Sequence, residues 1–134
     1  MIEIIHDFRA LQAPIRQIRN LAMRILKVEG ITESTVVTLV LCSNYTIRKL
    51  NAQYRRKNKA TDVLSFAFNE QDFLGEIYIS LQKAKVQARR FGFTYNQEIL
   101  RLLVHGVFHL LGYDHHTIKD QELMESKERI YTNL

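Results

Sequence analysis

The feature that most constrains the fold is the apolar run from Thr35 to Cys42, which is rich in β-branched residues and interrupted only by Thr38. A strand with one face in water alternates polar and apolar residues, whereas a nearly continuous apolar run is typical of a strand covered on both faces. We therefore expect residues 35–42 to form a central strand of a buried sheet.

Hydrophobic periodicity on either side of this run predicts further strands and a set of amphipathic helices. The five-residue connection 69–73 is suited to a hairpin between two antiparallel strands. The expected strands are Ile2–Phe8, Asp62–Phe68 and Leu74–Ser80. The expected helices run from Pro14 to about Glu29, from Ser43 or Asn44 to Tyr54, from after Ser80 to Phe91, from about Tyr95 to Leu111, and from Thr117 or Lys119 to Tyr131. The basic cluster 55–59 is expected to be a loop. The sequence predicts an α+β fold in the order β-α-β-α-β-β-α-α-α, with a mixed sheet of about four strands.

Composition and length narrow the class of protein. The chain has 134 residues with one Pro, five Gly and no linker-like stretch, so we expect residues 1–134 to form a single domain. No apolar run approaches the roughly 20 residues of a membrane span, and residues 1–7 lack the pattern of a secretory signal, so we expect a cytoplasmic protein without a membrane partner. The lone Cys42 is expected to pack in the core. A formal net charge of +5 makes nucleic acid a plausible partner.

Four of the five histidines lie within twelve residues. His105 and His109 are four apart on a predicted helix, so their side chains project from the same face. Gly112 can adopt the left-handed conformation that ends a helix, which lets the chain return and bring His115 to the same point. Three imidazoles leave a tetrahedral zinc ion one open position, as in catalytic sites. The spacing predicts one Zn²⁺ per chain, held by His105, His109 and His115 on the C-terminal helical half, while His116 is expected to be a solvent-exposed neighbour.

The same histidine spacing occurs in metzincin peptidases, in which a Glu after the first His is the general base. This chain has Gly106 there. Losing a general base costs typically 10²–10⁴-fold in rate, so a peptidase would need another carboxylate. Glu98, seven residues before His105, could reach inward, or it could be an early-helix Glu stabilised by the helix dipole. A zinc site without its own base better suits a phosphoryl substrate, with an arginine to neutralise charge.

Three blocks of the sequence resemble the YbeY endoribonucleases, also described as ribosomal RNA maturation factors. The first runs from Leu50 to Arg55 and continues at 60–66, the second covers 74–80, and the third is the eleven-residue segment 105–115 that contains Gly106. Together the blocks span about half the chain. Two positions depart from the family pattern, Ala67 where the family often has Pro and Glu76 where it often has Asp, and neither is an expected zinc ligand.

The resemblance implies that His105, His109 and His115 bind zinc and that Arg55 is a functional arginine at the active groove. The catalytic residues would be Arg55 and His109. An arginine presents a rigid fork to phosphate. The residues expected to bind the substrate backbone are Arg55, Arg56, Lys57 and Lys59, with Arg89 and Arg90 adding affinity that does not depend on sequence.

Each of the remaining polar residues of these blocks has two possible roles. Asp62 and Ser65 either serve the groove or order the start of a strand, and we favour the structural role for both. Asp114 is more readily a carboxylate that orients His115 than a general base. The identity of the general base stays open.

As the resemblance implies, the expected function is a zinc-dependent endoribonuclease that cuts single-stranded RNA in ribosomal RNA maturation, at the 3′ end of the small-subunit rRNA, and in ribosome quality control. The expected partners are single-stranded or ribosomal RNA and proteins of the small ribosomal subunit. Two alternatives stay open: a zinc hydrolase acting on peptides or another small substrate, and a non-catalytic assembly factor in which zinc only pins the C-terminal helices to the sheet. The oligomeric state is not indicated by the sequence.

Overall fold

The computed structural model describes residues 1–113 and 116–132. In this part of the chain the strands and helices follow the predicted order, which confirms the α+β fold. They are β1 (Ile2–His6), α1 (Ile15–Val28), β2 (Val36–Cys42), α2 (Asn44–Arg55), β3 (Val63–Glu70), β4 (Phe73–Ser80), α3 (Leu81–Phe91), α4 (Tyr95–Leu110) and α5 (Ile118–Thr132).

Within the described residues the strands form one four-stranded mixed sheet in the order β1-β2-β4-β3. β2 pairs in parallel with β1 and β4, and β3 pairs antiparallel with β4 at the edge. Leu39 and Leu41 of β2 are fully buried on one face, while Val40 and Cys42 pack with Ile47 of α2 on the other. The prediction of an internal strand covered on both faces is therefore confirmed.

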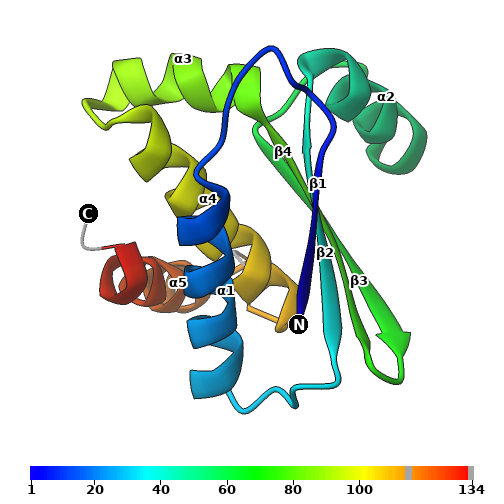
Figure 1. Ribbon diagram of the computed structural model, residues 1–134, viewed down its shortest axis with the longest axis vertical. Coiled ribbons are helices and arrows are strands. Elements are labelled where there is room, and N and C mark those ends of the chain that lie inside the picture. The colour runs from blue at the N-terminus through cyan, green and yellow to red at the C-terminus, as the bar shows by residue number, and fades with distance from the viewer. Residues whose placement is uncertain (114–115, 133–134) are drawn as a thin grey trace.

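The helices divide unequally between the two faces of the sheet (Figure 1). α2 lies on one side, and α1, α3, α4 and α5 gather on the other. α4 lies at the centre of this larger layer, where it packs against α1, α3, α5, β3 and β4. Its residues Leu102, Leu103, Val104, Val107 and Phe108 are buried in the main hydrophobic core. The helix that carries His105 and His109 is thus held by neighbours on several sides.

Gly106 allows α4 to approach the sheet closely. A Cβ atom at this position would lie 2.7 Å from Cγ2 of Ile77 and 3.2 Å from Oγ of Ser65. The Ser65 hydroxyl donates a hydrogen bond to the Gly106 carbonyl oxygen at 3.3 Å. The missing side chain therefore brings α4 against β3 and β4 in the turn that carries His105.

Most boundaries lie within two residues of the expected ones, for example β1, which ends at His6 rather than at Phe8. Two differences change a connection between elements. The five-residue hairpin connection is wrong: β3 continues to Glu70 and β4 begins at Phe73, so only Gln71 and Asp72 join them. Asp72 has a φ of 65°, a conformation that aspartate tolerates in tight turns, and β3 has a register shift between Ala67 and Glu70. Arg55 is the last residue of α2 rather than part of the following loop, which begins at Arg56 in the left-handed conformation. Among the described residues, no helix has the length and apolarity needed to cross a membrane.

Candidate active site

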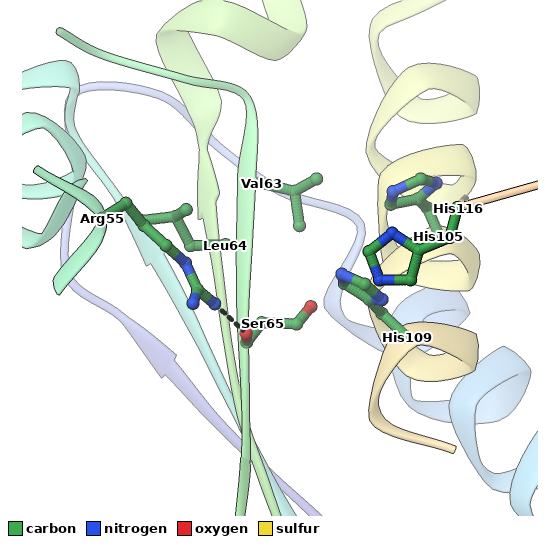
Figure 2. Close-up of a pocket in the computed structure, with 7 residues that line it drawn as sticks. All are labelled: Arg55, Val63, Leu64, Ser65, His105, His109 and His116. Atoms are coloured by element: carbon green, nitrogen blue, oxygen red, sulfur yellow. Dashed lines mark hydrogen bonds between the residues drawn. The ribbon is translucent and has the colours of Figure 1, made fainter. Parts of the chain in front are cut away.

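A pocket of about 340 Å³ opens between the edge of the sheet and α4. Its lining comes from α2, β3, α4 and the segment before α5: Arg55, Val63, Leu64, Ser65, His105, His109 and His116. Figure 2 shows the three imidazole rings on one wall, with Ser65 and Arg55 facing them from the sheet side. The pocket thus brings Arg55 together with His105 and His109, two of the three predicted zinc ligands. Arg55 precedes both histidines by at least fifty residues in the sequence.

His105 is oriented by a carboxylate from the last helix. Its Nδ1 lies 2.8 Å from Oε1 of Glu128, in α5. A carboxylate accepts the hydrogen bond, so the proton of a neutral imidazole sits on Nδ1 and the lone pair sits on Nε2. Histidines that bind metals are commonly held in this way by an acceptor at the other ring nitrogen.

His109 has the same arrangement with a backbone acceptor. Its Nδ1 donates to the carbonyl oxygen of Tyr113 at 3.1 Å, which again places the lone pair on Nε2. The rings of His105 and His109 have centroids 6.1 Å apart. Two imidazoles on one helix face, each held by an acceptor at Nδ1, fit the donor set of zinc.

The third predicted ligand, His115, and its neighbour Asp114 lie outside the described residues. Within the part of the chain that the structure describes, no group of three His, Cys, Asp or Glu is assembled for a metal ion. His116 is exposed, as predicted, but it also lines the pocket beside His105 and His109. The density of histidines in this segment was the signal that could have included it in the site.

The Arg55 side chain is positioned by a hydrogen bond to the backbone of β3 and by an aromatic ring. Its Nη2 donates to the Ser65 carbonyl oxygen at 3.0 Å, and its guanidinium carbon lies 5.0 Å from the centroid of the Phe66 ring. The hydrogen bond to Ser65 uses one of five N–H donors of the guanidinium group. Arg55 itself is exposed at the rim of the pocket, where it can meet an anionic substrate.

The other predicted substrate-binding residues lie outside the pocket lining. Arg56, Lys57 and Lys59 are exposed in the loop after α2, and Arg89 and Arg90 are exposed in the last turn of α3. The loop therefore adds positive charge beside Arg55 rather than inside the pocket.

Glu98 does not reach the histidines. It is fully buried and forms two hydrogen bonds with Arg101, Nε to Oε1 at 2.7 Å and Nη2 to Oε2 at 2.9 Å. These hydrogen bonds raise the pKa of Arg101. Gln87 donates to Glu98 at 2.8 Å and to Asp62 at 3.2 Å, so the carboxylate belongs to a polar network between α3, α4 and β3.

Asp62 and Ser65 have the structural contacts that we favoured. Asp62 accepts a hydrogen bond from the backbone N–H of Val63 at 2.8 Å, which orders the start of β3. Ser65 bonds to the Gly106 carbonyl, although it also lines the pocket. Sequence reasoning missed Glu128, because no local pattern links α5 to a histidine 23 residues earlier.

Comparison with known proteins identifies the family. The family model described as "Endoribonuclease YbeY" matches residues 5–134. An endoribonuclease YbeY from Desulforamulus reducens is 45% identical over 113 residues, covering 77% of this chain and 74% of the relative. One from Bacillus velezensis is 33% identical over 143 aligned positions, covering 96% of this chain and 91% of the relative.

A solved structure has the same fold. The solution structure of TM1509 from Thermotoga maritima superposes with a TM-score of 0.70 at 32% identity, covering 99% of this chain and 87% of that one. Because the family pattern extends over nearly the whole chain and includes the helix that presents the paired histidines, this protein belongs to the endoribonuclease YbeY family.

Proposed function

We propose that this protein is a zinc-dependent endoribonuclease that cuts single-stranded RNA in the cytoplasm. Its role would be ribosomal RNA maturation, at the 3′ end of the small-subunit rRNA, and ribosome quality control, with small-subunit proteins as partners. The observation that carries the proposal is the pocket in which His105 and His109 face Arg55 across Ser65. Membership of the family supports RNA as the substrate.

His105 and His109 would hold the zinc ion through Nε2, with His115 as the predicted third ligand. When bound, zinc supplies Lewis acidity toward a phosphoryl oxygen and toward water. Glu128 and the Tyr113 carbonyl keep the two rings in the required tautomer. Arg55 would donate hydrogen bonds to the phosphodiester and stabilise the negative charge that develops on it.

A peptidase is disfavoured by the geometry at Gly106. A side chain at this position would point toward Ile77 and Ser65, and even its Cβ atom would lie too close to them. A glutamate base of the metzincin kind therefore does not fit there. Glu98, the other candidate, is buried against Arg101 outside the pocket lining.

Cleavage of an end-labelled single-stranded RNA by zinc-loaded protein tests the proposal. We compare the wild type with His109→Ala and Arg55→Ala, and with Arg16→Ala as a matched control on the exposed surface of α1. All four proteins are purified identically and checked for folding by circular dichroism. A chelator should stop the wild type and added zinc should restore it.

We expect His109→Ala to be inactive and Arg55→Ala to lose roughly 10²-fold in kcat, the cost typical of a removed charge-stabilising donor. Arg16→Ala should cut like the wild type. Cleavage that is equal in the wild type and His109→Ala would show a contaminating nuclease and overturn the proposal. Digestion of casein by the wild type, with no RNA cleavage, would favour the zinc hydrolase of peptides instead.

A further inference from the structure

One segment rich in positive charge comprises α2 and the loop that follows it. Residues 44–61, which comprise α2 and the loop after it, contain six Lys and Arg and no Asp or Glu. The whole chain has a formal net charge of +5, so all the other residues together carry −1. Because α2 lies on its own side of the sheet (Figure 1), this charge is gathered on one face. The positive charge of α2 and its loop therefore favours an anionic partner on this face.

The loop after α2 folds back along the helix. Asn51, which is buried, donates from Nδ2 to the Lys59 carbonyl oxygen at 2.9 Å. The backbone carbonyl of Asn51 accepts from the N–H of Lys57 at 3.2 Å. Both bonds tie the loop to the middle of the helix, so the loop and the first turns of α2 enclose a second pocket.

This second pocket has a volume of about 450 Å³ and is lined by Asn44, Tyr45, Arg48, Asn58, Lys59 and Ala60. It lies within the size range of small-ligand sites, and none of its lining residues is acidic. The Asp nearest in sequence, Asp62, has its carboxylate bonded to Val63 and Gln87. The pocket therefore offers cations and amides without a competing carboxylate in its lining.

Tyr45 adds an aromatic surface to these cations. Tyr45 is 62% exposed, and the Lys49 ammonium lies 5.2 Å from the centroid of its ring. Exposed aromatic rings beside basic groups are the means by which proteins bind single-stranded nucleic acid, with bases stacked on rings and phosphates held by cations. Arg48 and Lys59 are the two cations that line the same pocket as Tyr45.

The second pocket is continuous in sequence with the candidate active site. Ala60 lines the second pocket and Val63 lines the histidine pocket. Only Thr61 and Asp62 lie between them, so their Cα atoms are at most roughly 11 Å apart. One strand of RNA can therefore contact both pockets while it follows the basic loop.

We propose that the pocket formed by Tyr45, Arg48 and Lys59 is a nucleotide subsite, in which a nucleotide flanking the scissile bond stacks its base on Tyr45 and places its phosphate between Arg48 and Lys59. The inference rests on the proposed function, because the subsite would bind the RNA substrate of the proposed ribonuclease at a nucleotide away from the cleaved bond. The subsite selects unpaired RNA, because a base held in a duplex cannot stack on a side chain.

Fluorescence anisotropy with labelled single-stranded RNA tests the subsite by binding rather than by cleavage. The titrations use a dinucleotide and a twelve-residue oligonucleotide. Electrophoresis at the end of each titration checks that the RNA is intact. The variants are Tyr45→Ala, Tyr45→Phe and Arg48→Ala, with Arg16→Ala on α1 as the matched control and Arg55→Ala to report on the active-site pocket.

We expect Tyr45→Ala to weaken binding of the twelve-residue RNA by roughly 5- to 100-fold and Tyr45→Phe to restore it, since stacking needs the ring and not the hydroxyl. Arg48→Ala should also reduce the slope of log K against log salt by about 0.7, the value for one phosphate contact on a single strand. The Arg16→Ala control should bind like the wild type. The dinucleotide, too short to fill both pockets, should lose much less affinity in the Tyr45 and Arg48 variants.

Two results would overturn the subsite. If Tyr45→Ala and Arg48→Ala bind the twelve-residue RNA like Arg16→Ala while Arg55→Ala binds it weakly, the nucleotide subsite is wrong and the proposed ribonuclease stands. In that case the basic surface of α2 and its loop binds a different partner, such as an acidic protein surface. If the wild type binds neither RNA, the subsite and the proposed function both fail.

Discussion

Glu128 contributes to the candidate site without lining the pocket. Its carboxylate comes from α5 and accepts the hydrogen bond from Nδ1 of His105. The contact decides which ring nitrogen keeps a lone pair, and it limits rotation of the ring. A change at this residue should therefore act on metal binding through His105.

We predict that Glu128→Ala lowers zinc affinity by about 10- to 100-fold, the usual cost of removing a group that orients a histidine ligand. Glu128→Gln should recover most of the affinity, because the amide oxygen can accept the same hydrogen bond. Competition with a chromogenic chelator measures the affinity, and circular dichroism checks the fold. Equal zinc affinity in the wild type and Glu128→Ala would show that the contact does not support the ligand.

Cys42 shows how burial sets the chemistry of a single residue. Its side chain is fully buried, and its Sγ lies 3.6 Å from the Ile79 carbonyl oxygen. Burial, together with the negative charge of Asp7, raises the pKa of the thiol to about 12. The thiol is therefore neutral near pH 7, which agrees with the packing role expected from the sequence.

The raised pKa of Cys42 predicts a loss of stability in alkali. Folding favours the neutral thiol, so its contribution is complete below pH 9, the pKa of an ordinary thiol, and is lost as pH rises toward about 12. Urea unfolding at several pH values should show the free energy of unfolding falling over this range, and less steeply in Cys42→Ala. Identical pH profiles for the two proteins would contradict the prediction.

At the scale of elements, the packing of α4 on the sheet depends on Gly106. Helix propensity alone says that alanine would stabilise this position by about 1 kcal/mol. The sheet opposes this effect, because a Cβ would lie 2.7 Å from a branched methyl group of Ile77. Ile77 is itself fully buried and has little room to move.

We predict that Gly106→Ala is destabilising by about 1–3 kcal/mol, the usual cost of overpacking a core. The mutation should also lower the rate of RNA cleavage, since it displaces the turn that carries His105. Urea unfolding measures the first effect and the RNA assay the second. If the variant is as stable as the wild type, or more stable, helix propensity outweighs overpacking at this position.

At the scale of the whole molecule, the core and the candidate metal site are separate. The main hydrophobic core joins α1, α4 and the inner face of the sheet, and neither His105 nor His109 belongs to it. A bound ion would add stability by mass action without being needed for folding. A structural zinc ion, in contrast, would be needed for the chain to fold.

We predict that the metal-free protein remains folded. Zinc at a hundred times its dissociation constant should stabilise the wild type by about 2.7 kcal/mol, which raises Tm by roughly 10 °C for a chain of this size. Melting followed by circular dichroism, with zinc or chelator, should show this shift in the wild type and little or none in His109→Ala. A metal-free wild type that is already unfolded would favour the assembly factor with a structural zinc.

Local patterns in the sequence were enough to predict each strand and helix and the placement of His105 and His109 on one helix face. Periodicity and caps act through contacts within a few residues, so the sequence records them directly. Thr94 illustrates this, since it caps α4 through the reciprocal bond with Gln97 that helix starts often use. The boundary of the hairpin at Gln71 and Asp72 was missed because strand pairing extends across the register shift and overrides local composition.

Other features were decided by tertiary structure alone. Arg55 faces the histidines because α2 and α4 both pack against β3, and Glu128 reaches His105 because α5 packs against α4. Glu98, whose position in the sequence allowed it to reach inward, is instead held by Arg101 and Gln87. The sequence by itself determined which groups the chain can offer and on which element each one lies. Only the packing of distant elements decided which groups meet, because the energy of those contacts depends on burial and on geometry that no local pattern contains.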